Sequence, residues 1–520
     1  MADRTHDHVH RLIRAMSPAE KRYFKLYTSR HMIGGRSNYQ LLFDAIAAME
    51  TYDEAALVRK FRKEAFTRRF AITKRRLYEA LLNSLSAYHS DRSVDARSHR
   101  LFHQVEVLYD KALYDDAAKV LRTASRLAEQ HERPHALLEA QQWRRRLTER
   151  GNYGHIGPTD LDTMRHEALR LQEDLATIDA LWDAKSRMLV DLYREGPARD
   201  ESRSRTFQGY LDIPEFQNTG RIETVQGRYL LHHLHSAVAF ASGDLSTCYT
   251  HLMANRTLLQ QEGERTMDAA YQALAILSNL TYVCMRLGRL DEGSRMLQEF
   301  RRIPVDRRLP ETEDLELRLF ATSISLEIAL HIRAGDFAKG LELVPLVERG
   351  LGRYGDKLGA VRRAGFLYQV AYCYFGVGQT AQALRWCHRL LNELRANESA
   401  ELLGFGRILE LMLLLEQDDR RTLHYALRNT ERGLKGHGGA RRSEVLALQC
   451  IRQVLRANDL ALRHAAFDEL RRGLAELDKD PLEQVVFEHV DLGAWAESQR
   501  TGRSFADVVK QRLSSSGLAA

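Results

Sequence analysis

The sequence has little proline, little cysteine and no long apolar run. Only 9 prolines occur in 520 residues, and the runs of alternating Val, Ile and Thr that would indicate strands are missing. No apolar run approaches the roughly 18 residues of a membrane-spanning helix, and residues 1–4 begin no hydrophobic signal core. We therefore expect an all-α protein that is cytoplasmic and has no membrane partner.

The usual signatures of catalysis and cofactor binding are also missing. The chain has no GxxxxGK(S/T) phosphate loop, no GxGxxG after a strand, no HExxH and no GxSxG. Carboxylates are plentiful, but nothing in the sequence marks a pair of them as an acid and a base. We expect neither an enzyme nor a cofactor, and an active site that the sequence does not reveal is the third of our hypotheses.

The side chains that bind metals occur in arrangements that do not favour a metal site. The five cysteines form no CxxC pair, and each stands alone in a helical pattern, so we expect small buried apolar side chains. Two groups of histidines would each need a further ligand to hold zinc. These histidines are His6 and His10, and then His232, His233 and His235. We predict no metal.

Glycine-centred turns recur along the chain at a nearly constant spacing. In residues 368–391, apolar side chains at offsets of three and four flank Gly378, which predicts two helices joined by a left-handed glycine as an αα-hairpin. The same glycine-centred turn between two apolar segments occurs at Gly335, Gly288 and Gly243, at spacings of 43, 47 and 45 residues. Internal repeats of this length indicate a solenoid, because one hairpin cannot bury its apolar face alone. Weaker forms of the turn precede these at Gly196, Gly151 and Ala112.

A small residue follows each of the four main glycines by five positions, which allows two helices to cross closely. These residues are Ala383, Gly340, Gly293 and Cys248. The pattern resembles the tetratricopeptide repeat, whose Gly-x-aromatic-x-x-Ala core corresponds to Gly378–Ala383, with Thr380 at the aromatic position. The period of about 39–47 residues exceeds the standard of about 34, so we expect longer helices. The resemblance implies a right-handed α-solenoid of tetratricopeptide-like helix hairpins.

We predict four segments from this pattern. Residues 1–95 form a small, basic, helical N-terminal domain, in which Ser17-Pro18-Ala19-Glu20 is a capping box. Residues 96–480 form the α-solenoid, and residues 481–513 form helices that cap it, because an array of repeats needs a closing element. Residues 514–520 are expected to be a disordered tail.

The N-terminal segment contains the most basic part of the chain. Residues 57–76 hold nine Lys/Arg and a single Glu64, whereas the whole chain has a net charge of only +7. A helix starting at Thr73 would resemble the second helix of a helix-turn-helix, whose first residues meet the major groove of DNA. The other interpretation is a small helical core with a solvated basic face or a docking site for an acidic partner. The nucleic-acid candidates are Arg68, Arg69, Lys74, Arg75 and Arg76.

Three motifs near the ends of the chain carry a second resemblance. They are SPAEKRYFKLY at 17–27, ITKRRLYEALLNSL at 72–85 and WAESQRTGRSFADVV at 495–509. These motifs resemble an uncharacterised family of helical-repeat proteins from Bacteroidota. That resemblance implies a bacterial cytoplasm and supplies no mechanism.

In tetratricopeptide-like arrays the first helix of each hairpin lines a concave groove, so the first resemblance also implies partner-binding positions. Counted back from the glycines, they are His233, Ser278, Tyr282, Met285, Tyr368, Tyr372 and Phe375. Tyrosine and methionine suit an extended peptide or a helix. Internal packing in a tighter superhelix is the other interpretation of these side chains.

Our leading hypothesis is a non-enzymatic scaffold or adaptor that binds a peptide or protein in this groove. The alternative is a regulator whose basic N-terminal helices contact nucleic acid while the repeat array senses a partner. The sequence indicates neither the identity of the partner nor the oligomeric state.

Overall fold

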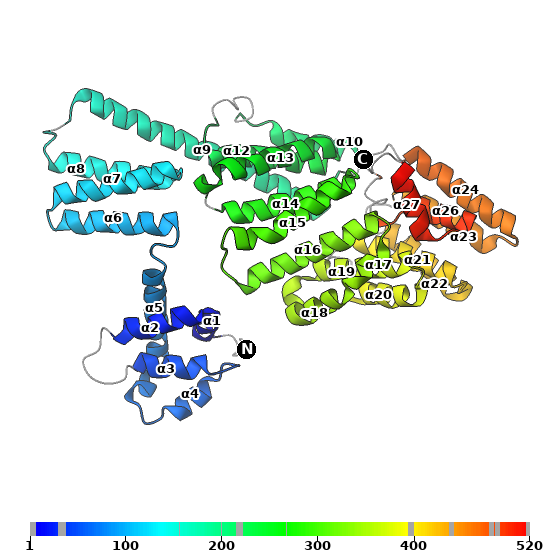
Figure 1. The fold of residues 1–520 in the computed structure, drawn as a ribbon, viewed down its shortest axis with the longest axis horizontal. Coiled ribbons are helices and arrows are strands. Elements are labelled where there is room, and N and C mark those ends of the chain that lie inside the picture. Colours follow the sequence, from blue (N-terminus) through cyan, green and yellow to red (C-terminus); the bar gives the residue numbers. More distant parts are fainter. Residues whose placement is uncertain are drawn as a thin grey trace. The chain divides into compact units, whose positions relative to one another are not determined.

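The structure is a computed structural model in which the backbone folds into helices joined by turns (Figure 1). It describes residues 7–29, 38–154, 156–198, 200–214, 222–266, 268–393, 400–435, 441–477, 483 and 489–515. Over these residues there is no strand, so the predicted all-α fold of stacked helix hairpins is confirmed. No described helix combines the length and the apolar character that crossing a membrane requires.

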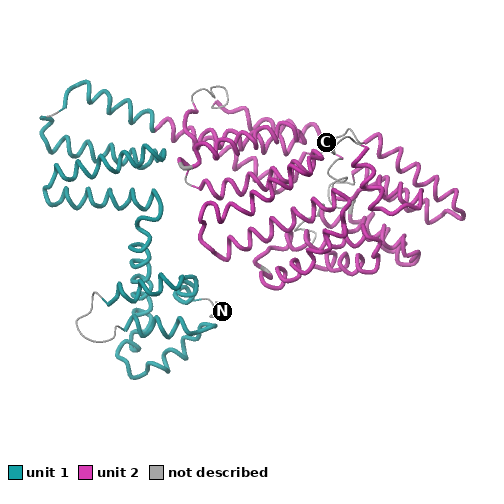
Figure 2. The backbone as a smooth tube through the Cα atoms, in the orientation of Figure 1, with its two compact units in different colours: residues 1–171 teal, residues 172–520 magenta. Residues whose placement is uncertain are grey.

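The chain divides into two compact units, residues 1–171 and residues 172–520 (Figure 2). The division falls inside the long helix α9, within the segment predicted as the solenoid, and the predicted domain boundaries stay predictions. The helices that begin in the first unit are α1 His8–Ala15, α2 Pro18–Ser29, α3 Asn38–Ala47, α4 Glu54–Lys60, the 3-10 helix η1 Ala65–Arg69, α5 Phe70–Tyr88, α6 Val94–Asp110, α7 Tyr114–Gln130, α8 Pro134–Arg150 and α9 Pro158–Glu195.

A side-chain capping box marks the start of α2, whereas the start of α5 has no side-chain cap. The capping box is present, because the Ser17 amide donates to Glu20 at 2.6 Å and the Glu20 amide donates to Ser17 Oγ at 3.3 Å. The helix that we expected to start at Thr73 starts at Phe70, and the Thr73 hydroxyl donates to the Arg69 carbonyl at 3.3 Å. Phe70 is buried in the N-terminal core, so the helix begins with a residue of its packed face.

The second unit stacks further hairpins and ends in two short helices. Its helices after α9 are α10 Glu201–Gln208, η2 Gly209–Leu211, α12 Val225–Ala241, α13 Leu245–Glu262, η4 Gly263–Arg265, α14 Ala269–Arg286, α15 Leu290–Asp306, α16 Glu313–Arg333, α17 Phe337–Glu342, α18 Val344–Tyr354, η5 Gly355–Leu358, α19 Ala360–Gly376, α20 Thr380–Glu393, α21 Ala400–Glu416, α22 Arg420–Lys435, α23 Arg442–Arg456, α24 Leu460–Leu477, α26 Leu492–Thr501 and α27 Phe505–Ser515. Consecutive helices pack as antiparallel pairs, such as α12 with α13 and α14 with α15.

The glycines of the main predicted turns adopt the left-handed conformation that ends a helix. Gly243, Gly288, Gly335 and Gly378 all have φ between +73° and +83°. After α19, the amide of Gln379 donates to the carbonyl of Tyr374 at 2.9 Å, which satisfies one of the last carbonyls of the helix. The left-handed glycines predicted from the sequence are confirmed at these four turns.

Of the three weaker turns, Gly196 and Ala112 take the left-handed conformation, with φ of +77° and +58°, whereas Gly151 does not. Gly151 has φ −80°, and the positive φ values fall on Asn152 and Tyr153. Gly151 lies in the turn after α8, as predicted, but as the C-cap residue of α8 it does not take the left-handed conformation. Asp418 takes the left-handed conformation in the turn after α21 without being a glycine, with φ +54°.

The small residues that follow the turns lie where two helices cross. A Cβ atom on Gly340 would lie 2.7 Å from Cys373 Sγ, and one on Gly293 would lie 3.3 Å from Leu330 Cδ2. Ala383 is completely buried. The close crossings predicted from the spacing are therefore present.

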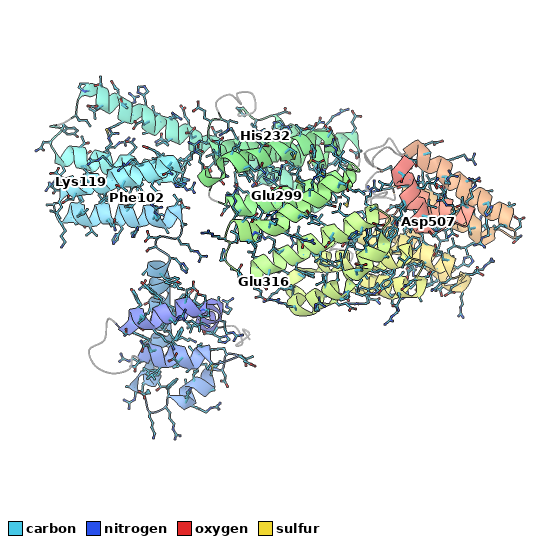
Figure 3. All side chains as sticks on the ribbon, viewed as in Figure 1. Phe102, Lys119, His232, Glu299, Glu316 and Asp507 are labelled. Atoms are coloured by element: carbon cyan, nitrogen blue, oxygen red, sulfur yellow. The ribbon has the colours of Figure 1, made fainter. Side chains whose placement is uncertain are left out.

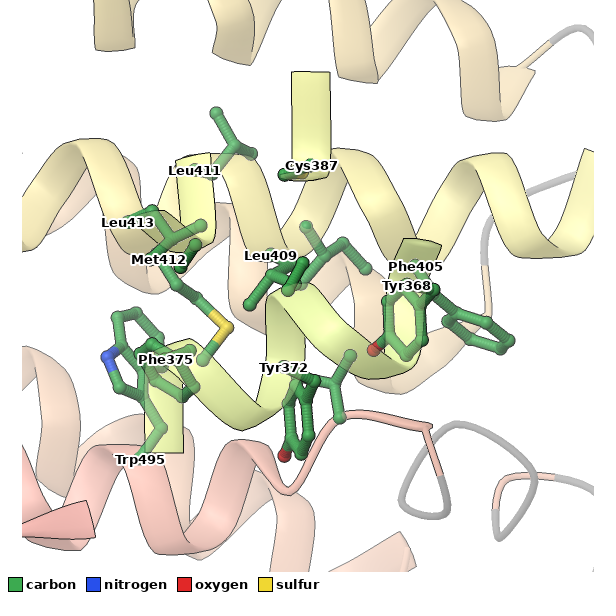
Figure 4. Packing of buried hydrophobic residues seen from close by; sticks show 14 of the residues in the cluster. Tyr368, Tyr372, Phe375, Cys387, Phe405, Leu409, Leu411, Met412, Leu413 and Trp495 are labelled. Atoms are coloured by element: carbon green, nitrogen blue, oxygen red, sulfur yellow. The ribbon is translucent and has the colours of Figure 1, made fainter. Parts of the chain in front are cut away.

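Apolar burial holds the hairpins together, and ion pairs add to it at the surface. The largest apolar cluster joins the helices from α16 to α24 with α26 and α27, and its centre around α19 and α21 is shown in Figure 4. Arg256 on α13 lies 2.8 Å from Glu299 on α15, and Arg353 on α18 pairs with Glu316 on α16. Figure 3 labels the two glutamates. Such partly exposed pairs are each worth about 0–1 kcal/mol, so the apolar core provides most of the stability.

The last described helix, α27, reaches Ser515. Ser514 and Ser515 are therefore helical, while residues 516–520 of the predicted tail lie outside the described residues. Residues 478–482 and 484–488, at the start of the predicted cap, also lie outside them.

Candidate functional site

Four of the predicted partner-binding residues line one cavity of about 370 Å³ in the second unit. Tyr282 and Met285 come from α14, and Tyr368 and Tyr372 come from α19. The helix between them, α16, contributes Ser325, Leu326, Ala329 and Ile332. The first helices of three successive hairpins thus contribute side chains to the same space.

The C-terminal segment of the chain closes one side of this cavity. The Tyr368 hydroxyl donates to the His489 carbonyl at 2.6 Å, and the Asp491 amide donates to the Tyr372 hydroxyl at 3.0 Å. Figure 4 shows the Tyr372 hydroxyl directed toward this part of the chain. The His489 ring stacks on Phe405, with the centroids 4.4 Å apart. The tyrosine hydroxyls are therefore already paired with peptide groups.

Burial limits what α19 presents to a partner. Tyr368, Tyr372 and Phe375 are exposed by only 4%, 3% and 2%. The Phe505 ring of α27 packs 4.9 Å from the Phe375 ring, and Phe375 does not line the cavity. Internal packing, the second of our two interpretations, describes Phe375 in this structure.

His233 and Ser278 do not reach the cavity either. His233 on α12 lies edge-on to Tyr229, with the ring centroids 5.7 Å apart. Its burial, together with the nearby charge of Lys185, lowers the pKa of the His233 imidazole to about 4. The Ser278 hydroxyl donates to the Ala275 carbonyl inside α14 at 2.9 Å.

The cavity also contains charged and polar residues that we did not predict. Arg286 and Arg333 line it together with Gln369 and His489. The Arg286 guanidinium lies over the Tyr282 ring, 6.0 Å from its centroid. For α16, the count that identified Tyr368 and Tyr372 would have identified Ser325, Ala329 and Ile332 before Gly335. Nothing in the local pattern indicates His489, because it is more than a hundred residues from α19 in sequence.

Acidic pH is expected to weaken the docking of the C-terminal segment through His489. Burial, with the charges of Arg441 and Arg286, lowers the pKa of the His489 imidazole to about 4. In the unfolded chain the pKa is about 6.5, so the unfolded state binds the proton first as pH falls. The stabilisation from neutral His489 is complete above pH 6.5 and is lost towards pH 4; at pH 5 the loss is about 2 kcal/mol.

Differential scanning calorimetry at pH 7 and pH 5 measures this loss. The wild type should lose more stability over this interval than His489→Asn, which does not titrate. His424→Asn, at an exposed position on α22, is the matched control and should behave as the wild type. Equal losses for the wild type and His489→Asn would show that His489 does not carry the pH dependence.

The five basic candidates of the N-terminal segment separate into one half-buried and four exposed residues. Arg68, Arg69, Arg75 and Arg76 are exposed. Lys74 is half-buried, with its Nζ atom 2.9 Å from Asp7 Oδ2 and 3.1 Å from the Tyr52 hydroxyl, and it also pairs with Glu54. Lys74 therefore joins α1, α4 and α5 and is not available to a phosphate. The start of α5 at Phe70 also removes the helix start at Thr73 on which the helix-turn-helix comparison depended.

Replacing Lys74 by methionine is expected to destabilise the N-terminal helices by about 2 kcal/mol. The reason is that the Asp7 and Glu54 carboxylates would lose the cation that lies between them. The matched control Arg69→Met, at an exposed position, should change stability by less than about 0.5 kcal/mol. Thermal unfolding followed by circular dichroism measures both, and equal effects would contradict a structural role for Lys74.

The histidines and cysteines form no group of three or more metal-binding side chains within the described residues. His10 Nε2 lies 3.0 Å from the Met49 carbonyl oxygen, and His6 lies outside the described residues. His232 Nδ1 lies 3.0 Å from His251 Nδ1, and burial lowers the pKa of both rings. All five cysteines are free and buried, as predicted.

No protein-family model matches the chain, and no curated protein matches it. Among solved structures, it is similar to a Rap protein complexed with competence and sporulation factor, at 12% identity over 81% of this chain and 99% of that chain, with a TM-score of 0.45. A likeness this distant carries no argument about what this chain binds.

Proposed function

We propose that the protein is a non-enzymatic scaffold or adaptor that binds a peptide, or a segment of a protein, at the cavity between α14, α16 and α19. The observation that carries the proposal is the convergence of Tyr282, Met285, Tyr368 and Tyr372 on that cavity. Its volume of about 370 Å³ lies in the range of ligand pockets, roughly 300–1,000 Å³. Its aliphatic and aromatic walls would bind an apolar side chain.

The bonds of the C-terminal segment support a peptide as the ligand. The tyrosine hydroxyls of α19 pair with a backbone carbonyl at His489 and a backbone amide at Asp491. The same face of α19 therefore already forms hydrogen bonds with a peptide carbonyl and with a peptide amide. The Gln369 side chain is already bonded to Ser325, so a partner chain would offer its carbonyl groups to Arg333, which also lines the cavity.

A selection from a displayed library of random 12-residue peptides against the full chain tests the proposal. Selected peptides should bind the variant carrying Tyr282→Ala and Met285→Ala roughly tenfold more weakly than the wild type, because both side chains line the cavity. Tyr425→Ala is the control, since Tyr425 on α22 is 63% exposed. The absence of any reproducible peptide, or equal binding by both variants, would contradict the proposal. Fluorescence anisotropy with the synthetic peptides gives the affinities.

The alternative function, nucleic-acid contact by the N-terminal segment, depends on the four exposed arginines at the start of α5 and in η1. Titration of fluorescent DNA and RNA at two salt concentrations tests it, because phosphate contacts weaken steeply with salt. Binding at low salt that is lost on replacing Arg68, Arg69, Arg75 and Arg76 by glutamine would support it.

We also propose a bacterial cytoplasmic location, which the motifs at the two ends of the chain imply.

A further inference from the structure

A second and larger hollow adjoins the cavity. This cleft of about 1,010 Å³ is lined by residues of α16 and α19 on one side and of α24, α26 and α27 on the other. The cleft and the cavity share Ile332, Arg333 and Tyr372. An extended ligand anchored in the cavity would therefore continue past Arg333 into the cleft.

The charges along this path are mainly positive. Among the described residues, the two hollows are lined by five arginines and two carboxylates, Asp468 and Asp491. Both carboxylates are already paired, since Arg512 lies 2.9 Å from Asp491 and Arg500 lies 3.1 Å from Asp468. The arginines are Arg286, Arg333, Arg471, Arg472 and Arg512.

Arg333 and Arg472 are the cations that remain for a ligand. Within the part of the chain that the structure describes, neither makes an ion pair. Arg333 is half-buried at the junction of the two hollows, and Arg472 is exposed on α24. A guanidinium in a partly desolvated position is stabilised by a carboxylate that binds it through two hydrogen bonds.

We propose that the ligand of this site is an acidic peptide segment, with an apolar side chain in the cavity and its carboxylates against Arg333 and Arg472 in the cleft. This inference rests on the proposed function, and it adds the chemical class of the partner. The aliphatic wall of the cavity, with Leu326, Ile332 and Val361, favours a peptide side chain over a nucleobase. The peptide groups that already meet Tyr368 and Tyr372 favour the same choice.

The composition of the peptides selected by the full chain tests this inference separately from the proposed function. Peptides selected on the wild type should be enriched in Asp and Glu relative to the library. Synthetic versions with every Glu and Asp changed to Gln and Asn should bind about tenfold more weakly. The variant carrying Arg333→Gln and Arg472→Gln should lose a similar factor for the acidic peptides and little for their amide versions.

The matched control is Arg385→Gln, because Arg385 is exposed on α20 and lines neither hollow. Its affinity for the acidic peptides should equal that of the wild type. Selected peptides without acidic enrichment, still dependent on Tyr282 and Met285, would overturn the acidic class and leave the proposed function standing. A fluorescent single-stranded oligonucleotide that binds the wild type and loses affinity in the Arg333→Gln, Arg472→Gln variant would assign the cleft to nucleic acid and overturn the inference.

Discussion

Replacing Trp495 by alanine is expected to lower the free energy of unfolding of the second unit by about 4 kcal/mol. Trp495 on α26 is completely buried, and its ring meets the Phe467 ring edge-on with the centroids 5.3 Å apart. Trp495 belongs to the apolar cluster that joins α26 to the repeat helices, part of which is drawn in Figure 4. Alanine would remove the indole ring and leave a cavity that the packed helices around it cannot fill.

Trp182 provides a control of the same residue type in the same unit. It lies on α9 and is 55% exposed, so Trp182→Ala should change stability by less than about 1 kcal/mol. Calorimetry of the full chain separates the two variants, and circular dichroism at the end of each transition checks that the same helices have melted. Similar effects for Trp495→Ala and Trp182→Ala would show that the C-terminal helices are not part of the main core.

The docking of α26 also affects the candidate site. Asp491, whose amide donates to the Tyr372 hydroxyl, is the N-cap residue of α26, and its side chain accepts from the Ala494 amide at 2.8 Å. Loss of Trp495 should therefore loosen the contact that covers α19. If the peptide site needs this covering segment, Trp495→Ala will also weaken peptide binding at temperatures at which the repeat helices remain folded.

The repeat turns could be predicted from the sequence because their determinants are local. A left-handed residue after a helix favours glycine, and Gly378 and Gly288 adopt that conformation with φ of +76°. The periodic apolar positions of each helix identify the face that packs. At Asp418, which also takes the left-handed conformation, the residue type does not mark the turn.

The face of each helix was predictable, whereas the segment that covers it was not. Periodicity places Tyr368 and Tyr372 on one side of α19, and it gives no information about which distant part of the chain lies there. The bond from Tyr368 to His489 spans 121 residues. Arg333 was missed for a related reason, since a surface arginine and an arginine at the junction of two hollows are identical in sequence. The partners of Lys74 likewise come from other helices, so its ion pairs were not predictable.

Gly376→Ala is expected to lower the free energy of unfolding of the second unit by about 3 kcal/mol, because a Cβ atom there would overlap the Phe337 ring. Phe337 is 1% exposed and cannot move aside, since its ring packs 5.6 Å from the Phe505 ring and 6.1 Å from the Tyr372 ring. Relief of the overlap would displace α27 or α19. The crossing of α17 over the end of α19 thus requires a glycine for lack of space, although Gly376 has no positive φ.

Gly365→Ala on the same helix is the matched control with the opposite expected sign. A Cβ atom at Gly365 would meet nothing within 4 Å, so alanine should stabilise α19 by about 1 kcal/mol through its higher helix propensity. Urea denaturation followed by circular dichroism compares the midpoints of the two variants with that of the wild type. A stabilised Gly376→Ala variant would show that α17 does not cross α19 at this distance. Opposite signs for two alanines on one helix would identify the steric effect at Gly376.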